Sequence, residues 1–192
     1  MSIKCVVGPA LAFLLIATPI TAAEEKDQSE VASLPTTPLV DILDAVSQKS
    51  GKKFLMDARA PREVVVGQLS PKQVTYSSLL IILRNNELAA VTTGDIVNIV
   101  VGRTIRAYPL PIVNEDDDSI DGEEWVTRVI HLKNAPAAHL VPIMRPIMPS
   151  AGHLAANPDS NTIMMVDRYA NVKRVTQMIL EMDASTPPQS AE

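Results

Sequence analysis

The chain has 192 residues and a formal net charge of −5; hydrophobic residues make up 46% of it and aromatic residues 3%. With so few aromatic side chains, any core must be built from Val, Ile, Leu, Met and Ala. Cys5 is the only cysteine, which excludes a disulfide within the chain and a site made of several thiolates. The negative charge is concentrated in residues 24–30 and 107–123, so the sequence has no polybasic stripe of the kind that nucleic acid requires.

The first residues have the three-part layout of a secretory signal peptide. Lys4 gives a short positive region, residues 6–17 are mostly apolar, and residues 21–23 offer small side chains for cleavage. The apolar run is shorter than the roughly 20 residues that a membrane-spanning helix needs. We therefore expect residues 1–23 to be a signal peptide that is cleaved after Ala23, with an uncleaved anchor helix as the alternative.

Residues 31–106 predict a first small α+β domain in which helices are set between short strands. Leu39, Ile42, Leu43 and Val46 recur at helical spacing, and we expect this helix to have Thr37 as its N-cap and Gly51 at its left-handed end. A second helix should begin after Thr75. The remaining expected elements are strands at residues 53–56, 63–66, 88–92 and 96–101, the last two joined by a tight turn.

Residues 107–123 break this pattern, and their prolines and carboxylates predict a solvated acidic linker. Residues 124–183 then predict a second α+β domain with the order β-α-β-β-α, which matches a KH-like topology. We expect Pro146 to end or kink its first helix. The expected strands lie near residues 125–132, 153–157 and 162–166. One expected helix begins near Pro136, and the other spans about residues 170–182. Residues 184–192 predict a disordered tail.

The residues that could carry chemistry favour structural roles. A calcium loop that begins at Asp117 would need a glutamate where Arg128 stands. The histidines His131, His139 and His153 lack the spacing of a metal motif, and the methionines favour core packing over copper binding. Motifs for nucleotide binding or acyl transfer are absent from the sequence. RNA binding by the KH-like domain is disfavoured because its GXXG loop is missing. We expect no enzyme activity, no metal and no cofactor.

The sequence resembles the N-terminal periplasmic domains of type II secretion secretins. The stretch from SLPTTPLV to GDIVNIV resembles their first domain, which is shared with the signalling domain of TonB-dependent receptors. The pieces RVIHLKNA, GHLAANPDSNTIMMVD and ILEMD resemble their second, KH-like domain. The resemblance implies a periplasmic protein that can associate with the outer-membrane secretin complex. Its first domain would dock on inner-membrane platform components, and its second domain would pack side by side into rings. Because secretins continue with further ring domains and an outer-membrane barrel, we do not expect this chain to form a pore by itself.

The predicted function is therefore that of an interaction component in a type II or related secretion system. Its expected partners are an inner-membrane platform component, a full-length secretin and, in a ring, further copies of the chain; nucleic acid is not expected, and membranes only through partners. The candidate partner site is an edge strand formed by Val31, Ala32, Ser33 and Leu34, which could equally pair inside the domain. A TonB-type sensor module and a truncated secretin gene product are the alternatives.

Overall fold

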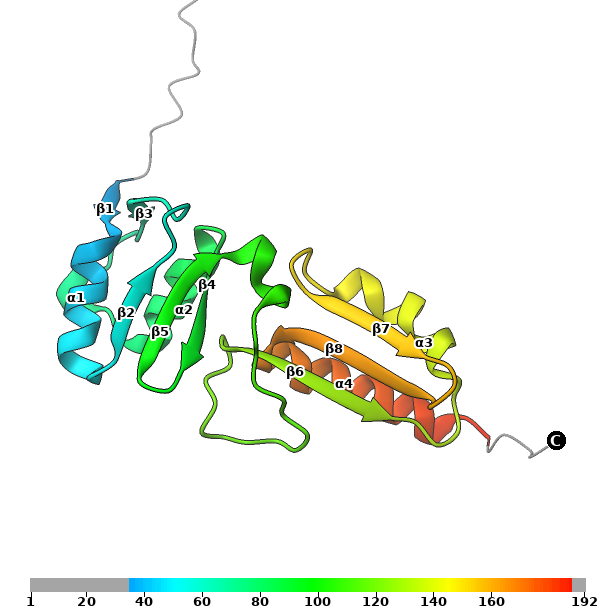
Figure 1. The fold of residues 1–192 in the computed structure, drawn as a ribbon. Helices are drawn as coiled ribbons and strands as arrows, with labels where there is room; N and C mark the ends of the chain where they lie inside the picture. The colour runs from blue at the N-terminus through cyan, green and yellow to red at the C-terminus, as the bar shows by residue number, and fades with distance from the viewer. Residues whose placement is uncertain (1–34, 188–192) are drawn as a thin grey trace, which may run out of the picture. The chain divides into compact units, whose positions relative to one another are not determined.

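The computed structural model describes residues 35–187, and Figure 1 draws it as a ribbon. Three expectations lie outside these residues. They are the signal peptide with its cleavage after Ala23, the candidate edge strand of Val31, Ala32, Ser33 and Leu34, and residues 188–192 of the expected tail.

The N-terminal half, residues 35–107, consists of a small sheet, a separate strand pair and two helices. Strands β2, β5 and β4 lie in this order in the sheet, with β2 parallel and β4 antiparallel to β5, whereas β1 and β3 form an antiparallel pair. Short 3-10 helices occupy Pro71–Gln73 and Gly102–Ala107. The elements are β1 (Thr36–Pro38), α1 (Leu39–Ser50), β2 (Lys53–Met56), β3 (Glu63–Val65), α2 (Tyr76–Asn85), β4 (Leu88–Thr93) and β5 (Ile96–Val101).

Helix α1 has the expected apolar face and the expected end, but its N-cap is different. Gly51 has a φ of 71° and donates its N–H to the carbonyl oxygen of Ser47 at 2.9 Å, as a left-handed helix end requires. The prediction of Thr37 as N-cap is wrong, because Thr37 pairs with Val64 and the helix begins only at Leu39. Pro38 therefore occupies the cap position, where it makes no side-chain hydrogen bond.

Helix α2 begins at the expected cap. The Thr75 side chain accepts a hydrogen bond from the Ser78 N–H, and the Ser78 hydroxyl accepts one from the Thr75 N–H, which forms a reciprocal capping box. The core of the N-terminal half joins both helices to the sheet. Its fully buried side chains include Leu39, Ile42, Val46, Leu79, Val97 and Ile99.

The C-terminal half, residues 108–187, has the expected order β-α-β-β-α. Its antiparallel sheet has the order β6-β8-β7, and Tyr169, Val172, Val175 and Ile179 of α4 are fully buried in the core of this half. Helix α3 accommodates Pro142 and ends at Met144, and a 3-10 turn at Arg145–Ile147 contains Pro146, as the missing proline N–H predicts. The elements are β6 (Trp125–His131), α3 (Ala137–Met144), β7 (His153–Asn157), β8 (Thr162–Arg168) and α4 (Tyr169–Ser185).

The loop between β6 and α3 is held by one carboxylate of α4. Asp183 is only 5% exposed and accepts hydrogen bonds from the backbone N–H groups of Lys133, Asn134 and Ala135 at 2.8–3.0 Å. Burial alone would raise the pKa of Asp183, but the three backbone donors stabilise the carboxylate and leave the pKa below its ordinary value. Helix α4 ends at Ser185, one residue beyond the expected start of the tail at residue 184.

The acidic segment 107–123 is more ordered than its composition predicts. Val113 is buried in the core of the C-terminal half and donates its N–H to the carbonyl oxygen of Thr127, whose own N–H donates to the carbonyl oxygen of Pro111. The backbone N–H of Asp117 donates to the hydroxyl oxygen of Tyr169. A few apolar residues within the charged run thus anchor the segment, while residues 114–119 are exposed, as the acidic composition predicts.

Candidate docking surfaces and the joint between the halves

The outer edge of β2 is open within residues 35–187, since β2 stands first in its sheet and pairs there only with β5. The N–H groups of Lys53 and Asp57 point toward β5, so those of Phe54 and Met56 face away from it. Leu55 is 56% exposed beside this edge. An unpaired strand edge with apolar side chains is a template for another strand. The sequence predicts this strand, but only the pairing reveals which of its edges is free.

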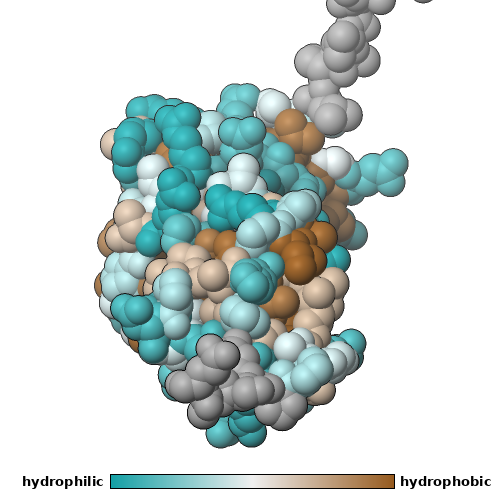
Figure 2. All heavy atoms as spheres, turned by 90° about the vertical axis from the view of Figure 1, so that its right-hand side faces the viewer, coloured by the Kyte–Doolittle hydropathy of each residue, from teal (hydrophilic) through white to brown (hydrophobic). Residues whose placement is uncertain are grey.

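Helices α3 and α4 border an apolar groove of about 470 Å³. Ile143 is 53% exposed and Met178 is 39% exposed, and Ile147 and Met182 line the groove with them. Figure 2 shows hydrophobic patches among hydrophilic side chains on one side of the molecule. The expected core role of the methionines is thus confirmed for Met144 and Met165 and is wrong for the exposed Met164 and Met178, which lie off the buried faces of their elements.

An apolar cluster joins the two halves. Trp125 and Val166 of the C-terminal sheet are buried together with side chains of β4, β5 and the 3-10 helix at Gly102–Ala107. Ile105 is completely buried in this cluster. Its remaining buried members are Ala89, Val91 and Val100. Burial of this kind stabilises an interface in rough proportion to the apolar area removed from water.

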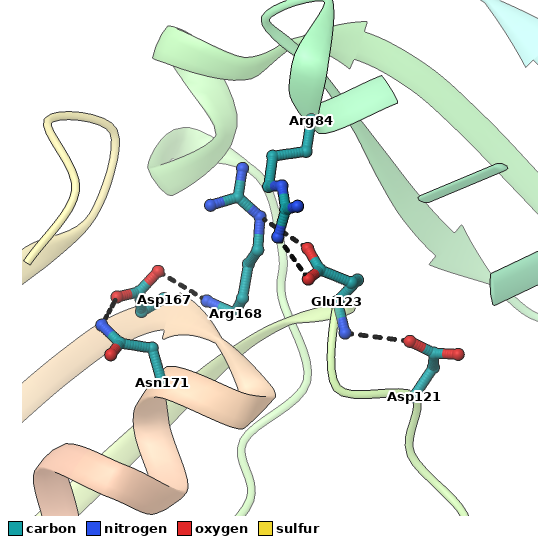
Figure 3. Close-up of polar contacts among 6 residues, drawn as sticks. All are labelled: Arg84, Asp121, Glu123, Asp167, Arg168 and Asn171. Atoms are coloured by element: carbon teal, nitrogen blue, oxygen red, sulfur yellow. Dashed lines mark hydrogen bonds and ion pairs between the residues drawn. The ribbon is translucent and has the colours of Figure 1, made fainter. Parts of the chain in front are cut away.

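A carboxylate between two arginines lies beside this cluster (Figure 3). Oε1 of Glu123 is 2.6 Å from Nη1 of Arg84 in α2, and its Oε2 is 3.3 Å from Nε of Arg168 at the end of β8. Arg168 in turn lies over the ring of Trp125, 4.9 Å from its centroid. The side chains of Glu123 and Arg168 are each 20% exposed, so this ion network is screened by water less than a surface pair would be.

The next residue makes a second polar contact across the joint. Tyr76 donates its hydroxyl to Oε1 of Glu124 at 3.1 Å and lies 3.3 Å from the hydroxyl of Thr92, and the ammonium of Lys52 lies over its ring. Burial, together with the nearby carboxylate, raises the pKa of the Tyr76 hydroxyl far above its ordinary value. The Tyr76 hydroxyl therefore keeps its proton, and can donate its hydrogen bond to Glu124, well into the alkaline range.

A buried carboxylate supports the position of Arg168. Asp167 is completely buried, and burial raises its pKa, although hydrogen bonds from the Asn171 amide and the Arg168 backbone N–H partly offset this effect. These contacts fix the junction of β8 and α4, as Figure 3 shows. The joint thus rests on charged residues from segments far apart in the sequence, and sequence patterns gave no signal for it.

The residues considered for chemistry do not come together within residues 35–187. His131 and His139 are exposed and His153 is half-buried, each on a different element. In this described part of the chain, no group of three or more His, Cys, Asp or Glu side chains has a geometry that could hold a metal ion. None of its helices is long and apolar enough to cross a membrane.

Comparisons with known proteins agree with this architecture. Residues 127–187 match the family model of the bacterial type II/III secretion system short domain. Secretin XcpQ of Pseudomonas aeruginosa is 28% identical over 167 residues, which are 85% of this chain and 24% of that protein. Secretin GspD 2 of Escherichia coli O78:H11 is 28% identical over 178 residues, which are 90% of this chain and 26% of that protein. The chain thus spans about a quarter of the length of these relatives.

Among solved structures, the type II secretion system outer membrane complex of Klebsiella pneumoniae, with PulD, PulS and the PulC HR domain, contains a chain of the same fold. The TM-score is 0.63 at 22% identity, over 79% of this chain and 26% of that one. Residues 127–187 in the C-terminal half are thus similar to the bacterial type II/III secretion system short domain. Over most of its length the chain is similar to the N-terminal domains of type II secretins, as its residue patterns predict.

Proposed function

We propose that this protein is a non-enzymatic, periplasmic interaction component of a type II or related secretion system. The observation that carries the proposal is the similarity to secretins over 85–90% of the chain. The proposed division of the chain is a first docking domain at residues 31–106, an acidic linker at 107–123 and a second domain at 124–183. Because the relatives are secretins, transport of proteins is the process in which we place it.

The proposed mode of action is the docking of a partner strand on an open sheet edge. The free edge of β2, with exposed Leu55 and Met56, supports this mode, since strand addition uses backbone hydrogen bonds for affinity and side chains for specificity. Val31, Ala32, Ser33 and Leu34 remain a second proposed edge. The complex similar in fold includes a PulC HR domain beside PulD, and we propose a PulC-like platform component as the partner of this chain.

Capture of partners from the periplasm tests the proposal. Cross-linking the tagged protein in its native host should recover secretion-system proteins, and Leu55→Asp should reduce this recovery because a charge next to the edge disfavours strand addition. Val40→Asp is the matched control, because Val40 is similarly exposed, at 53%, but belongs to α1 and not to β2. Absence of secretion components from the cross-links, together with unchanged protein export after gene deletion, would overturn the proposal.

Co-assembly with a full-length secretin, or with further copies of this chain, is the second candidate. The apolar groove between α3 and α4 favours it, because an exposed apolar surface is typical of a contact site. Ile143→Asp should then reduce the recovery of secretin and leave that of the platform component unchanged. Equal loss of both partners would contradict a separate role for this groove.

A further inference from the structure

A second groove of about 670 Å³ runs along α4 and differs from the apolar one in its chemistry. Cationic side chains contribute much of its lining, namely Arg128 from β6 and Lys173 and Arg174 from α4, while Leu180 and Ala184 add an apolar end. Asp116 and Glu181 are the acidic residues of the lining. The groove therefore combines excess positive charge with an apolar contact surface.

The groove already holds one carboxylate of the chain itself. Arg128 is only 9% exposed, and its Nη1 donates to Oδ1 of Asp116 at 2.7 Å while its Nη2 donates to the carbonyl oxygen of Asn114 at 3.1 Å. The Asp116 side chain is 63% exposed, so it covers the guanidinium from the solvent side. This pair shows that the groove accommodates a carboxylate next to a buried guanidinium, which is the strongest common pairing of charged groups in proteins.

The remaining cations of the groove are not neutralised to the same degree. Within residues 35–187, no carboxylate lies within ion-pair distance of Arg174, and Lys173 has only a long contact of 3.7 Å to the fully exposed Asp118. Thr176 adds an unsatisfied polar group to these two cations. It is 5% exposed, and its hydroxyl has no hydrogen-bond partner. A buried hydroxyl without a partner destabilises the free protein, and an acceptor from a ligand would remove this cost.

We propose that this groove binds an acidic side chain from an apolar-acidic protein segment of a partner. The carboxylate would pair with Arg174 and Lys173 and accept a hydrogen bond from Thr176, while a neighbouring apolar side chain would contact Leu180. Arg-rich recognition of acidic segments is a common mode of peptide binding. The inference goes beyond the proposed function, because it rests on the chemistry of the groove and not on the secretion system.

An NMR titration tests the proposed site: the isotope-labelled chain is titrated with a short capped peptide of alternating leucine and glutamate. The amide signals of Arg128, Lys173 and Gln177 should shift saturably, and the same peptide with glutamine should bind at least about fivefold more weakly. In about 1 M sodium chloride, where the Debye length is about 3 Å, the difference between the peptides should largely disappear. Equal binding of the two peptides, or shifts only in the N-terminal half, would overturn the proposal.

Substitutions separate the groove from general charge effects. Arg174→Gln should weaken binding of the glutamate peptide by about fivefold. Arg106→Gln, at an exposed site of the N-terminal half, should leave this binding unchanged. Thr176→Val should raise the melting temperature of the free protein and yet weaken binding of the peptide. A merely structural role of Thr176 would not produce a gain in stability together with a loss of binding. Inorganic phosphate is the last probe: equal shifts with phosphate at the same concentration would show an anion site and reject docking of a protein segment.

Discussion

Glu123 and Glu124 are consecutive residues, yet they bind opposite ends of one helix. Glu123 pairs with Arg84 in the last turn of α2, and Glu124 accepts a hydrogen bond from Tyr76, the first residue of that helix. The start of the C-terminal half is thereby fixed to both ends of a helix of the N-terminal half. Together with the cluster around Trp125, these contacts resist both separation and rotation of the halves.

Removal of the charge at Glu123 should weaken this connection. Glu123→Gln keeps the shape of the side chain but leaves Arg84 and Arg168 without their carboxylate, and we expect a loss of about 1–2 kcal/mol in the free energy of unfolding. Urea unfolding measures it. Lys53→Gln breaks the highly exposed pair of Lys53 with Asp95 and should produce no measurable change. Equal effects of the two substitutions would contradict a special role for the joint.

Tyr76 provides a separate test of the joint through pH. Because the pKa of Tyr76 is raised in the folded protein, its hydroxyl stays protonated to a higher pH in the folded state than in the unfolded state. Its contribution to stability is therefore present below about pH 10, the ordinary pKa of tyrosine, and is lost as the pH rises toward the folded pKa.

Tyr76→Phe should cost about 1 kcal/mol at neutral pH, since the hydrogen bonds to Glu124 and Thr92 are lost. It should also reduce the fall of stability in alkaline solution. Ultraviolet titration of tyrosinate should show ionisation of Tyr76 above its ordinary range in the wild type, as a step that is missing from the variant. Loss of a step at about pH 10 in the variant would show instead that Tyr76 is not buried as described.

The local elements of this fold could be predicted because their signals lie within a few residues. The helical spacing that begins at Leu39, the cap at Thr75 and the left-handed end at Gly51 each reflect chemistry inside one turn or one helix. The parallel pairing of β2 with β5 has no such signal, since it joins residues that are separated by helix α2 and the two strands β3 and β4.

The joint could not be predicted for a related reason. Glu123 lies in a run of carboxylates, and the composition of that run indicates a solvated segment. Which carboxylate meets a cation depends on how the halves pack, and Arg84 lies 39 residues earlier in the chain. Asp183 is similar, because its backbone partners lie about 50 residues away and only the folded chain brings them together.

Substitution of Asp183 should destabilise the C-terminal half strongly. Asp183→Asn keeps the size of the side chain but loses the charged acceptor for three backbone donors, so we expect a loss of about 2 kcal/mol in the free energy of unfolding at neutral pH. Chemical denaturation checks this value. Asp159→Asn, in the exposed turn between β7 and β8, is the matched control and should be neutral.

The pH dependence of Asp183 has a definite sign. Because the folded pKa lies below the unfolded value of about 4, the contribution is present above pH 4 and is lost as the pH falls through the folded pKa. Asp183→Asn should therefore flatten the acid side of the stability curve. An unchanged acid transition in the variant would contradict the role of the three backbone donors.

The apolar part of the joint can be measured directly, because Trp125 is the only tryptophan of the chain. Ile105→Ala removes a fully buried side chain next to this indole and should cost about 2–4 kcal/mol, from lost burial and from the cavity that remains. Water admitted beside the indole should shift the fluorescence of Trp125 to longer wavelength in the folded variant. Ile112→Ala is the matched control, since Ile112 is 67% exposed, and it should change neither fluorescence nor stability. A loss of stability in Ile105→Ala without a change in fluorescence would mean that Ile105 supports the N-terminal half alone and does not contribute to the contact with Trp125.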